Sequence, residues 1–177
     1  MSPRGAGLAL WLLALGATAV GCDTAPDWRE VRPPGLRLQF ALPCRPDTAA
    51  RRLVLAGAEA ELLLHACRVA GTTYALAAAD LGDATRVGAA LIQLSAAAKA
   101  NIVGRIVRDD PVVVVGMTPH PAARRQRIAG TLPDGAAVTE EVAVFAYGSR
   151  VYQATALAAH PDAAAMQAFF DALRVVP

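Results

Sequence analysis

Two kinds of hydrophobic spacing alternate along this chain. Apolar side chains at every second position, as over residues 36–40, have the period of a half-buried strand. Three further aliphatic segments follow, separated by short turns that contain glycine: 50–55, 59–69 and 72–80. Because such turns join neighbouring strands, this half of the chain predicts an antiparallel meander.

A helical spacing appears twice. The apolar residues of the first helical stretch, spaced three or four apart, are Val87, Leu91, Leu94, Ala98 and Ile102. They predict a helix over 85–103, with Asp83 or Thr85 as its N-cap and Gly104 at its end. The second apolar stripe, near the C-terminus, consists of Met166, Phe169, Phe170 and Leu173. It predicts a last helix over 162–173, which begins just after a proline.

A second set of strand-like segments lies between the two helices: 105–109, 112–115, 124–129, 137–147 and 150–158. Pro111 predicts a break between the first two, because proline cannot donate a hydrogen bond to a sheet. Gly148 and Ser149 predict a tight hairpin between the last two. Together these elements predict an α+β fold, in which one domain over 28–177 contains a twisted, mostly antiparallel sheet flanked by two main helices.

The N-terminus has the pattern of an export signal. Arg4 is followed by an uncharged, leucine-rich stretch over 5–20, which is short for a membrane-spanning helix. The tetrapeptide Ala-Val-Gly-Cys that ends at Cys22 resembles a lipobox, the site where signal peptidase II cuts before a diacylated cysteine; Ala19 stands where that pattern prefers leucine. An ordinary secretory signal and an uncleaved membrane anchor are the alternatives.

The resemblance to a lipobox implies a cellular location. Residues 1–21 are then a lipoprotein signal peptide, Cys22 carries the lipid, and 22–27 is a short polar tether. Because more than one acyl chain is attached and each methylene contributes about 0.8 kcal/mol, such an anchor holds a protein stably on a membrane. We therefore expect a protein of the bacterial cell envelope that faces the periplasm, with the choice between inner and outer membrane left open.

Two cysteines remain once Cys22 is assigned to lipidation. An even pair in an oxidising compartment predicts a disulfide between Cys44 and Cys67. A bridge across this sequence separation contributes about 3 kcal/mol to stability by constraining the unfolded chain. The alternative is two separate buried thiols.

Composition and charge exclude one class of partner. Hydrophobic residues make up 55% of the chain and the mean hydropathy is +0.37, values that the apolar N-terminus and many alanines raise. The net charge is only +2. Nucleic-acid binding needs a concentrated basic face, so we expect no nucleic-acid partner.

No cofactor or metal site is predicted. The three histidines are His65, His120 and His160, and no cysteine or second histidine follows any of them at a metal-ligand spacing. His65 shares strand parity with Cys67, which places it near the predicted disulfide.

No catalytic residue is predicted either. Ser95 and Ser149 lie outside the motifs that mark serine nucleophiles. Glu140 and Glu141 are neighbours on one predicted strand, so their side chains point to opposite faces and do not form a paired acid and base.

The densest positive cluster of the chain consists of Arg124, Arg125 and Arg127. On a membrane-tethered protein it is a candidate contact surface for an anionic lipid headgroup or a phosphorylated ligand. A solvated strand face, on which charge protects a sheet edge, is the alternative.

Four short motifs carry a resemblance to a known fold family. They are Trp28, the segment 40–46 (FALPCRP), the segment 148–153 (GSRVYQ) and the segment 169–174 (FFDALR). Together they resemble small bacterial exported proteins with the fold of PsbP, the extrinsic photosystem II protein. The subgroup that the chain resembles consists of proteobacterial lipoproteins or membrane proteins that carry a cysteine in the Leu-Pro turn and another two strands later.

The resemblance implies an antiparallel sheet flanked by helices, an α/β/α sandwich, and it implies no shared activity. The leading functional hypothesis is accordingly a membrane-tethered, non-enzymatic module that binds an envelope protein partner or a small ligand. The alternatives are an envelope hydrolase without a recognisable motif and a purely structural envelope protein.

Overall fold

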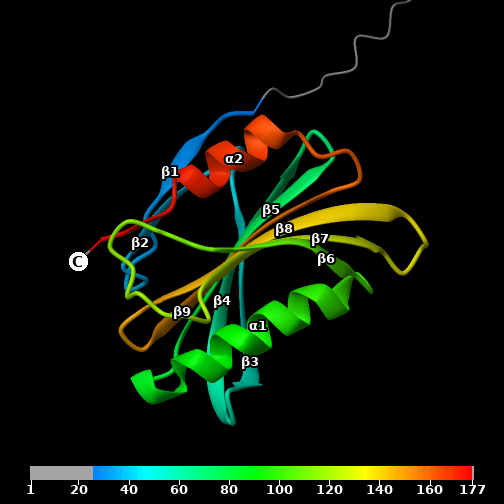
Figure 1. Ribbon diagram of the computed structural model, residues 1–177. Helices are drawn as coiled ribbons and strands as arrows, with labels where there is room; N and C mark the ends of the chain where they lie inside the picture. The colour runs from blue at the N-terminus through cyan, green and yellow to red at the C-terminus, as the bar shows by residue number, and fades with distance from the viewer. Residues whose placement is uncertain (1–25, 177) are drawn as a thin grey trace, which may run out of the picture.

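A seven-stranded antiparallel sheet forms the centre of the protein (Figure 1). The computed structural model describes residues 26–176; the predicted signal peptide, Cys22 and most of the tether lie outside the described residues. In spatial order the strands are β3 (Asp47–Leu55), β4 (Ala58–Val69), β5 (Thr72–Asp80), β9 (Arg150–Ala158), β8 (Ala137–Tyr147), β7 (Arg124–Thr131) and β6 (Arg105–Pro111). The predicted α+β class is confirmed. Within 26–176, no helix has the length and apolar character needed to cross a membrane.

A second, three-stranded sheet lies apart from the first. Its order is β1 (Arg29–Val31), β2 (Leu38–Leu42) and β10 (Arg174–Val175). The strand predicted over 36–40 corresponds to β2, and it pairs with the two ends of the described chain rather than with the meander.

The two helices cover opposite faces of the large sheet. They are α1 (Val87–Asn101), preceded by a short 3-10 turn (Ala84–Arg86), and α2 (Ala163–Asp171). Arg125 and Gln126 are neighbours on β7, so their side chains point to opposite faces. The Arg125 guanidinium donates to Gln167 of α2, whereas Gln126 lines a pocket together with residues of α1. Figure 1 shows α1 across the sheet and α2 beside β1 and β2.

Several large aromatic side chains pack on the face of the large sheet that α2 covers. Phe40, Phe145, Tyr152 and Phe169 are fully buried. The rings of Phe145 and Tyr152 stack with centroids 5.1 Å apart. The Tyr152 hydroxyl donates to the Leu36 carbonyl oxygen at 2.7 Å, which ties the large sheet to the segment before β2.

The first helix ends earlier than its sequence pattern predicts. α1 stops at Asn101, and the left-handed backbone conformation that follows it (φ 45°) lies at Val103 and not at Gly104, which was predicted to end the helix. Gly104 has another reason to be glycine, because a Cβ atom there would lie 2.4 Å from Cγ2 of Ile128 on β7. The small residue allows a close approach to the sheet.

The predicted strand over 112–115 is wrong. β6 continues to Pro111 and then ends, and beyond it only the Val112 N–H donates to the Ala123 carbonyl oxygen, at 3.4 Å. The valine-rich segment that follows makes only a single bridge, between Val115 and Arg174. Val113 is 89% exposed, which shows that the aliphatic run does not mark a buried strand.

Candidate anion-binding pocket

Three strands place arginines and carboxylates in rows on the α2 side of the sheet. Cross-strand pairing sets Arg108 of β6 opposite Arg127 of β7, and Arg127 opposite Glu141 of β8. The next row sets Asp110 opposite Arg125. Directly opposite side chains on a sheet interact, so this register brings three guanidinium groups and two carboxylates together.

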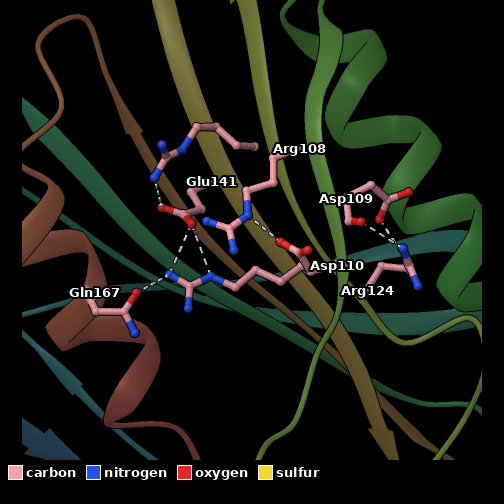
Figure 2. Close-up of polar contacts among 8 residues, drawn as sticks. Arg108, Asp109, Asp110, Arg124, Glu141 and Gln167 are labelled. Atoms are coloured by element: carbon pink, nitrogen blue, oxygen red, sulfur yellow. Dashed lines mark hydrogen bonds and ion pairs between the residues drawn. The ribbon is translucent and has the colours of Figure 1, made fainter.

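Glu141 is the centre of this cluster (Figure 2). Its carboxylate is 9% exposed and accepts from Nε of Arg125 at 3.1 Å, while a second Arg125 nitrogen lies 3.0 Å away. A terminal nitrogen of Arg127 lies 3.5 Å from its other oxygen. One nearly buried carboxylate therefore balances two arginines.

The Arg125 guanidinium contacts three neighbouring side chains. Besides Glu141, its guanidinium donates to the Gln167 amide oxygen of α2 at 2.9 Å. The same group lies over the Phe170 ring, 4.2 Å from the centroid, a cation–π contact. Arg125 thus fastens α2 to the sheet and has little freedom to recognise anything else.

Arg108 and Arg127 are freer than Arg125. Their side chains are 68% and 42% exposed, and Arg108 pairs with Asp110 at 2.5 Å. The pocket between these groups has a volume of about 220 Å³. It is lined by Arg108, Asp110, Pro111, Arg125, Arg127, Glu141 and Gln167. Three arginines against two carboxylates leave a formal charge of +1, and the guanidinium fork suits planar carboxylates and phosphates.

The structure divides the predicted arginine cluster. Arg125 and Arg127 lie in the pocket, but Arg124 points to the α1 side because strand side chains alternate. Its Nε atom lies 2.8 Å from an Asp109 carboxylate oxygen, and Figure 2 draws this pair apart from Glu141. The third arginine of the pocket, Arg108, is not predicted from the sequence, because nothing in the local pattern shows that β6 pairs with β7.

The predicted disulfide between Cys44 and Cys67 is confirmed, with sulfur atoms 2.10 Å apart. Cys44 lies two residues after the end of β2 and Cys67 lies on β4, so the bridge joins the small sheet to the large one. His65 lies on the same face of β4 as Cys67, and its ring contacts Phe40 edge to face at 5.8 Å between centroids.

Ser149 and His120, two further residues considered in the sequence analysis, have structural partners. Ser149 donates its hydroxyl to the Asp80 carboxylate at 2.7 Å, and this hydrogen bond is the main cause that lowers the pKa of Asp80. The ring of His120 accepts the backbone N–H of Ala122 at Nδ1, 3.0 Å away. Within the described part of the chain, no three His, Cys, Asp or Glu side chains are grouped so that they could hold a metal ion.

Glu140 has an unusual environment for a carboxylate. The prediction that it points away from Glu141 is confirmed, because Glu141 faces α2 and its neighbour on the strand faces the α1 side. Glu140 is 5% exposed, and its Oε2 atom has no hydrogen-bond partner among the described residues. Burial raises the pKa of Glu140 to about 7. Because Glu140 and Glu141 lie on opposite faces of the sheet, they do not form an acid–base pair with each other.

No model of a protein family matches the sequence, and no curated protein is significantly similar to it.

Proposed function

We propose that this chain is a lipid-anchored protein of the bacterial envelope whose periplasmic domain, of the PsbP-like kind, is a non-enzymatic binding module. We further propose that its ligand carries a phosphate or carboxylate group, which binds between Arg108 and Arg127. The single observation that carries this proposal is the position of these two arginines, directly opposite each other on β6 and β7.

Like charges at directly opposite strand positions repel each other, so the Arg108–Arg127 pair costs stability unless an anion lies close to it. Asp110 and Glu141 compensate part of this charge from the sides. An anion between the two exposed guanidinium groups would accept charge-assisted hydrogen bonds from both. The pocket volume of about 220 Å³ admits a small group of this kind and not a large organic molecule.

The proposed location in the envelope is supported by features other than the pocket. The uncharged segment before Cys22 and its lipobox support export and lipidation. The disulfide between Cys44 and Cys67 agrees with them, because structural disulfides form and persist outside the reducing cytosol.

Replacement of Arg127 by glutamine tests the pocket. Inorganic phosphate and citrate are titrated into the protein, and binding is followed by calorimetry and by NMR shifts of the arginine side chains. We expect R127Q to weaken anion binding about tenfold or more, since one charge-assisted hydrogen bond contributes about 1.5–3 kcal/mol. Arg127 is the better choice than Arg125, whose loss would also disturb α2.

Arg52→Gln is the matched control, because Arg52 is an exposed arginine on the far edge strand, β3. It removes the same charge and is expected to leave binding unchanged. The pocket proposal fails if neither anion binds the unmodified protein, or if R52Q and R127Q weaken binding equally.

Replacement of Cys22 by alanine tests the anchor. In a Gram-negative host, we expect the intact mass of the unmodified chain to show the loss of residues 1–21 and the gain of the acyl chains. Cys22→Ala is expected to show neither change, because it cannot receive the acyl chains and signal peptidase II cuts before a diacylated cysteine. Thr24→Ala is the control and is expected to be processed like the unmodified chain. A mature protein whose intact mass shows an unmodified Cys22, or a retained Met1, would contradict lipoprotein processing.

A further inference from the structure

The large sheet has two edge strands, β6 and β3, and they differ in how they are protected. An edge strand presents unpaired backbone N–H and C=O groups that can pair with another strand. Proteins usually block such edges with bulges, prolines, charges or covering side chains.

The edge of β6 is blocked. The strand has a bulge between Ile106 and Arg108, and it ends at Pro111, which has no N–H. Arg124 reaches across to the edge and donates to the Asp109 carbonyl oxygen at 3.0 Å. Little backbone remains there for another strand.

The edge of β3 is open over most of its length. Its outward carbonyl at Val54 is taken by Gln93 of α1, whose amide nitrogen lies 3.1 Å away. Because peptide groups alternate in direction along an antiparallel strand, those of Thr48, Ala50 and Arg52 point to the same outer side. They have no backbone or side-chain hydrogen-bond partner within 26–176.

β3 has neither a bulge nor a proline. Its nine residues pair with β4 without a register shift and contain no proline, and residues 47–52 are all exposed. Two small residues, Ala49 and Ala50, lie in the middle of this exposed stretch, so another strand can approach closely. The charged residues stand on either side of them, with Asp47 before and Arg51 and Arg52 after.

We propose that β3 pairs antiparallel with β3 of a second copy of this chain, so that the two large sheets become one continuous sheet. The order of charges along β3 favours a second copy of the same chain as its partner. In an antiparallel pair of identical strands, the acidic end of one lies opposite the basic part of the other.

Hydrogen bonding restricts the register of this pair. Residues whose peptide groups point outward must lie opposite one another in the two copies. This condition allows only registers in which one residue of β3 lies opposite the same residue of the second copy. Only the register centred on Ala49 sets Asp47 opposite an arginine, namely Arg51 of the second copy, and symmetry forms this pair twice. The register centred on Arg51 sets like charges opposite each other, which is unfavourable. In the chosen register Thr48 and Ala50 exchange backbone hydrogen bonds with the second copy.

The pair of Ala49 residues at the symmetry axis offers a direct test. Residues that face each other in a non-hydrogen-bonded antiparallel pair have Cα atoms about 4.5 Å apart, within the range that a disulfide spans. We expect full-length Ala49→Cys, produced in a host with an oxidising periplasm, to form a disulfide-linked dimer on non-reducing gels. Ile106→Cys, on the blocked edge of β6, is the matched control and is expected to remain monomeric.

Charge exchange tests the register. In the Ala49→Cys background, we expect R51D to lower the dimer yield at least about fivefold, because two attractive pairs become repulsive. D47R together with R51D is expected to restore it. The proposal is overturned if Ala49→Cys cross-links no better than Ile106→Cys, or if R51D leaves the yield unchanged. It is also overturned if the double exchange fails to restore the yield while the unfolding midpoint matches that of the parent.

Discussion

Glu140→Gln is expected to stabilise the protein by about 3 kcal/mol above pH 7. The pKa of this carboxyl rises from 4.5 to about 7 on folding, because burial disfavours the charged form. Each pKa unit corresponds to about 1.4 kcal/mol, which yields the expected size of the effect. Glutamine keeps the shape of the side chain and removes the charge that burial penalises.

The sign of the pH dependence follows from the same shift. The folded protein holds the proton of Glu140 more tightly than the unfolded chain does. Its contribution to stability is therefore fully present below about pH 4.5 and is lost as the pH rises through about 7. Urea unfolding at pH 5, 6, 7 and 8 is expected to show a falling free energy of unfolding for the unmodified protein and a weaker dependence for E140Q.

Glu141→Gln is the matched control on the same strand. Its carboxylate balances Arg125 and Arg127, so its loss leaves two arginines without their counter-charge. We expect E141Q to destabilise the protein at pH 7, opposite in sign to E140Q. Equal pH slopes for E140Q and the unmodified protein would contradict the assignment of the titrating group to Glu140.

Removal of the disulfide is expected to lower the free energy of unfolding by about as much as Glu140→Gln raises it. Replacing Cys44 and Cys67 together by alanine frees a loop with a sequence separation of 23, which costs about 3 kcal/mol by the chain-entropy estimate. Because the bridge also joins the segment after β2 to β4, the small sheet loses its covalent link to the large one.

The disulfide prediction is measured by urea unfolding of C44A/C67A and of the unmodified protein with and without a reductant. The double variant and the reduced protein are expected to unfold at the same lower urea concentration. C22A, which leaves this bridge intact, is the control and is expected to unfold like the parent. An unfolding midpoint that does not respond to the reductant would contradict a structural role for the bridge.

Local periodicity was sufficient where an element is long. The hairpin of β8 and β9 and the stripe of α2 that contains Phe169 and Phe170 are visible in the sequence because several turns or pleats repeat the same pattern. β1 and β10 have only three and two residues, too few to show a period. Both form because β2 offers them an edge on which to pair.

The valine-rich segment after Pro111 has the composition of a strand but does not form one. Its composition favours a strand, but a strand is stable only when a neighbouring strand accepts its hydrogen bonds. The ladder with β7 ends at Pro111, and within 26–176 the segment that follows forms no ladder with another strand, only the bridge at Val115. Propensity alone could not show this missing partner.

The sequence by itself determined the fold class, the opposite orientations of Glu140 and Glu141, and the pairing of Cys44 with Cys67. Each of these follows from a local period or from the small number of cysteines. Only the tertiary structure decided that Arg108 lies opposite Arg127, because cross-strand register depends on how distant segments pack. The raised pKa of Glu140 has the same origin, since burial of a strand residue is set by the layers that cover it and not by its neighbours in the chain.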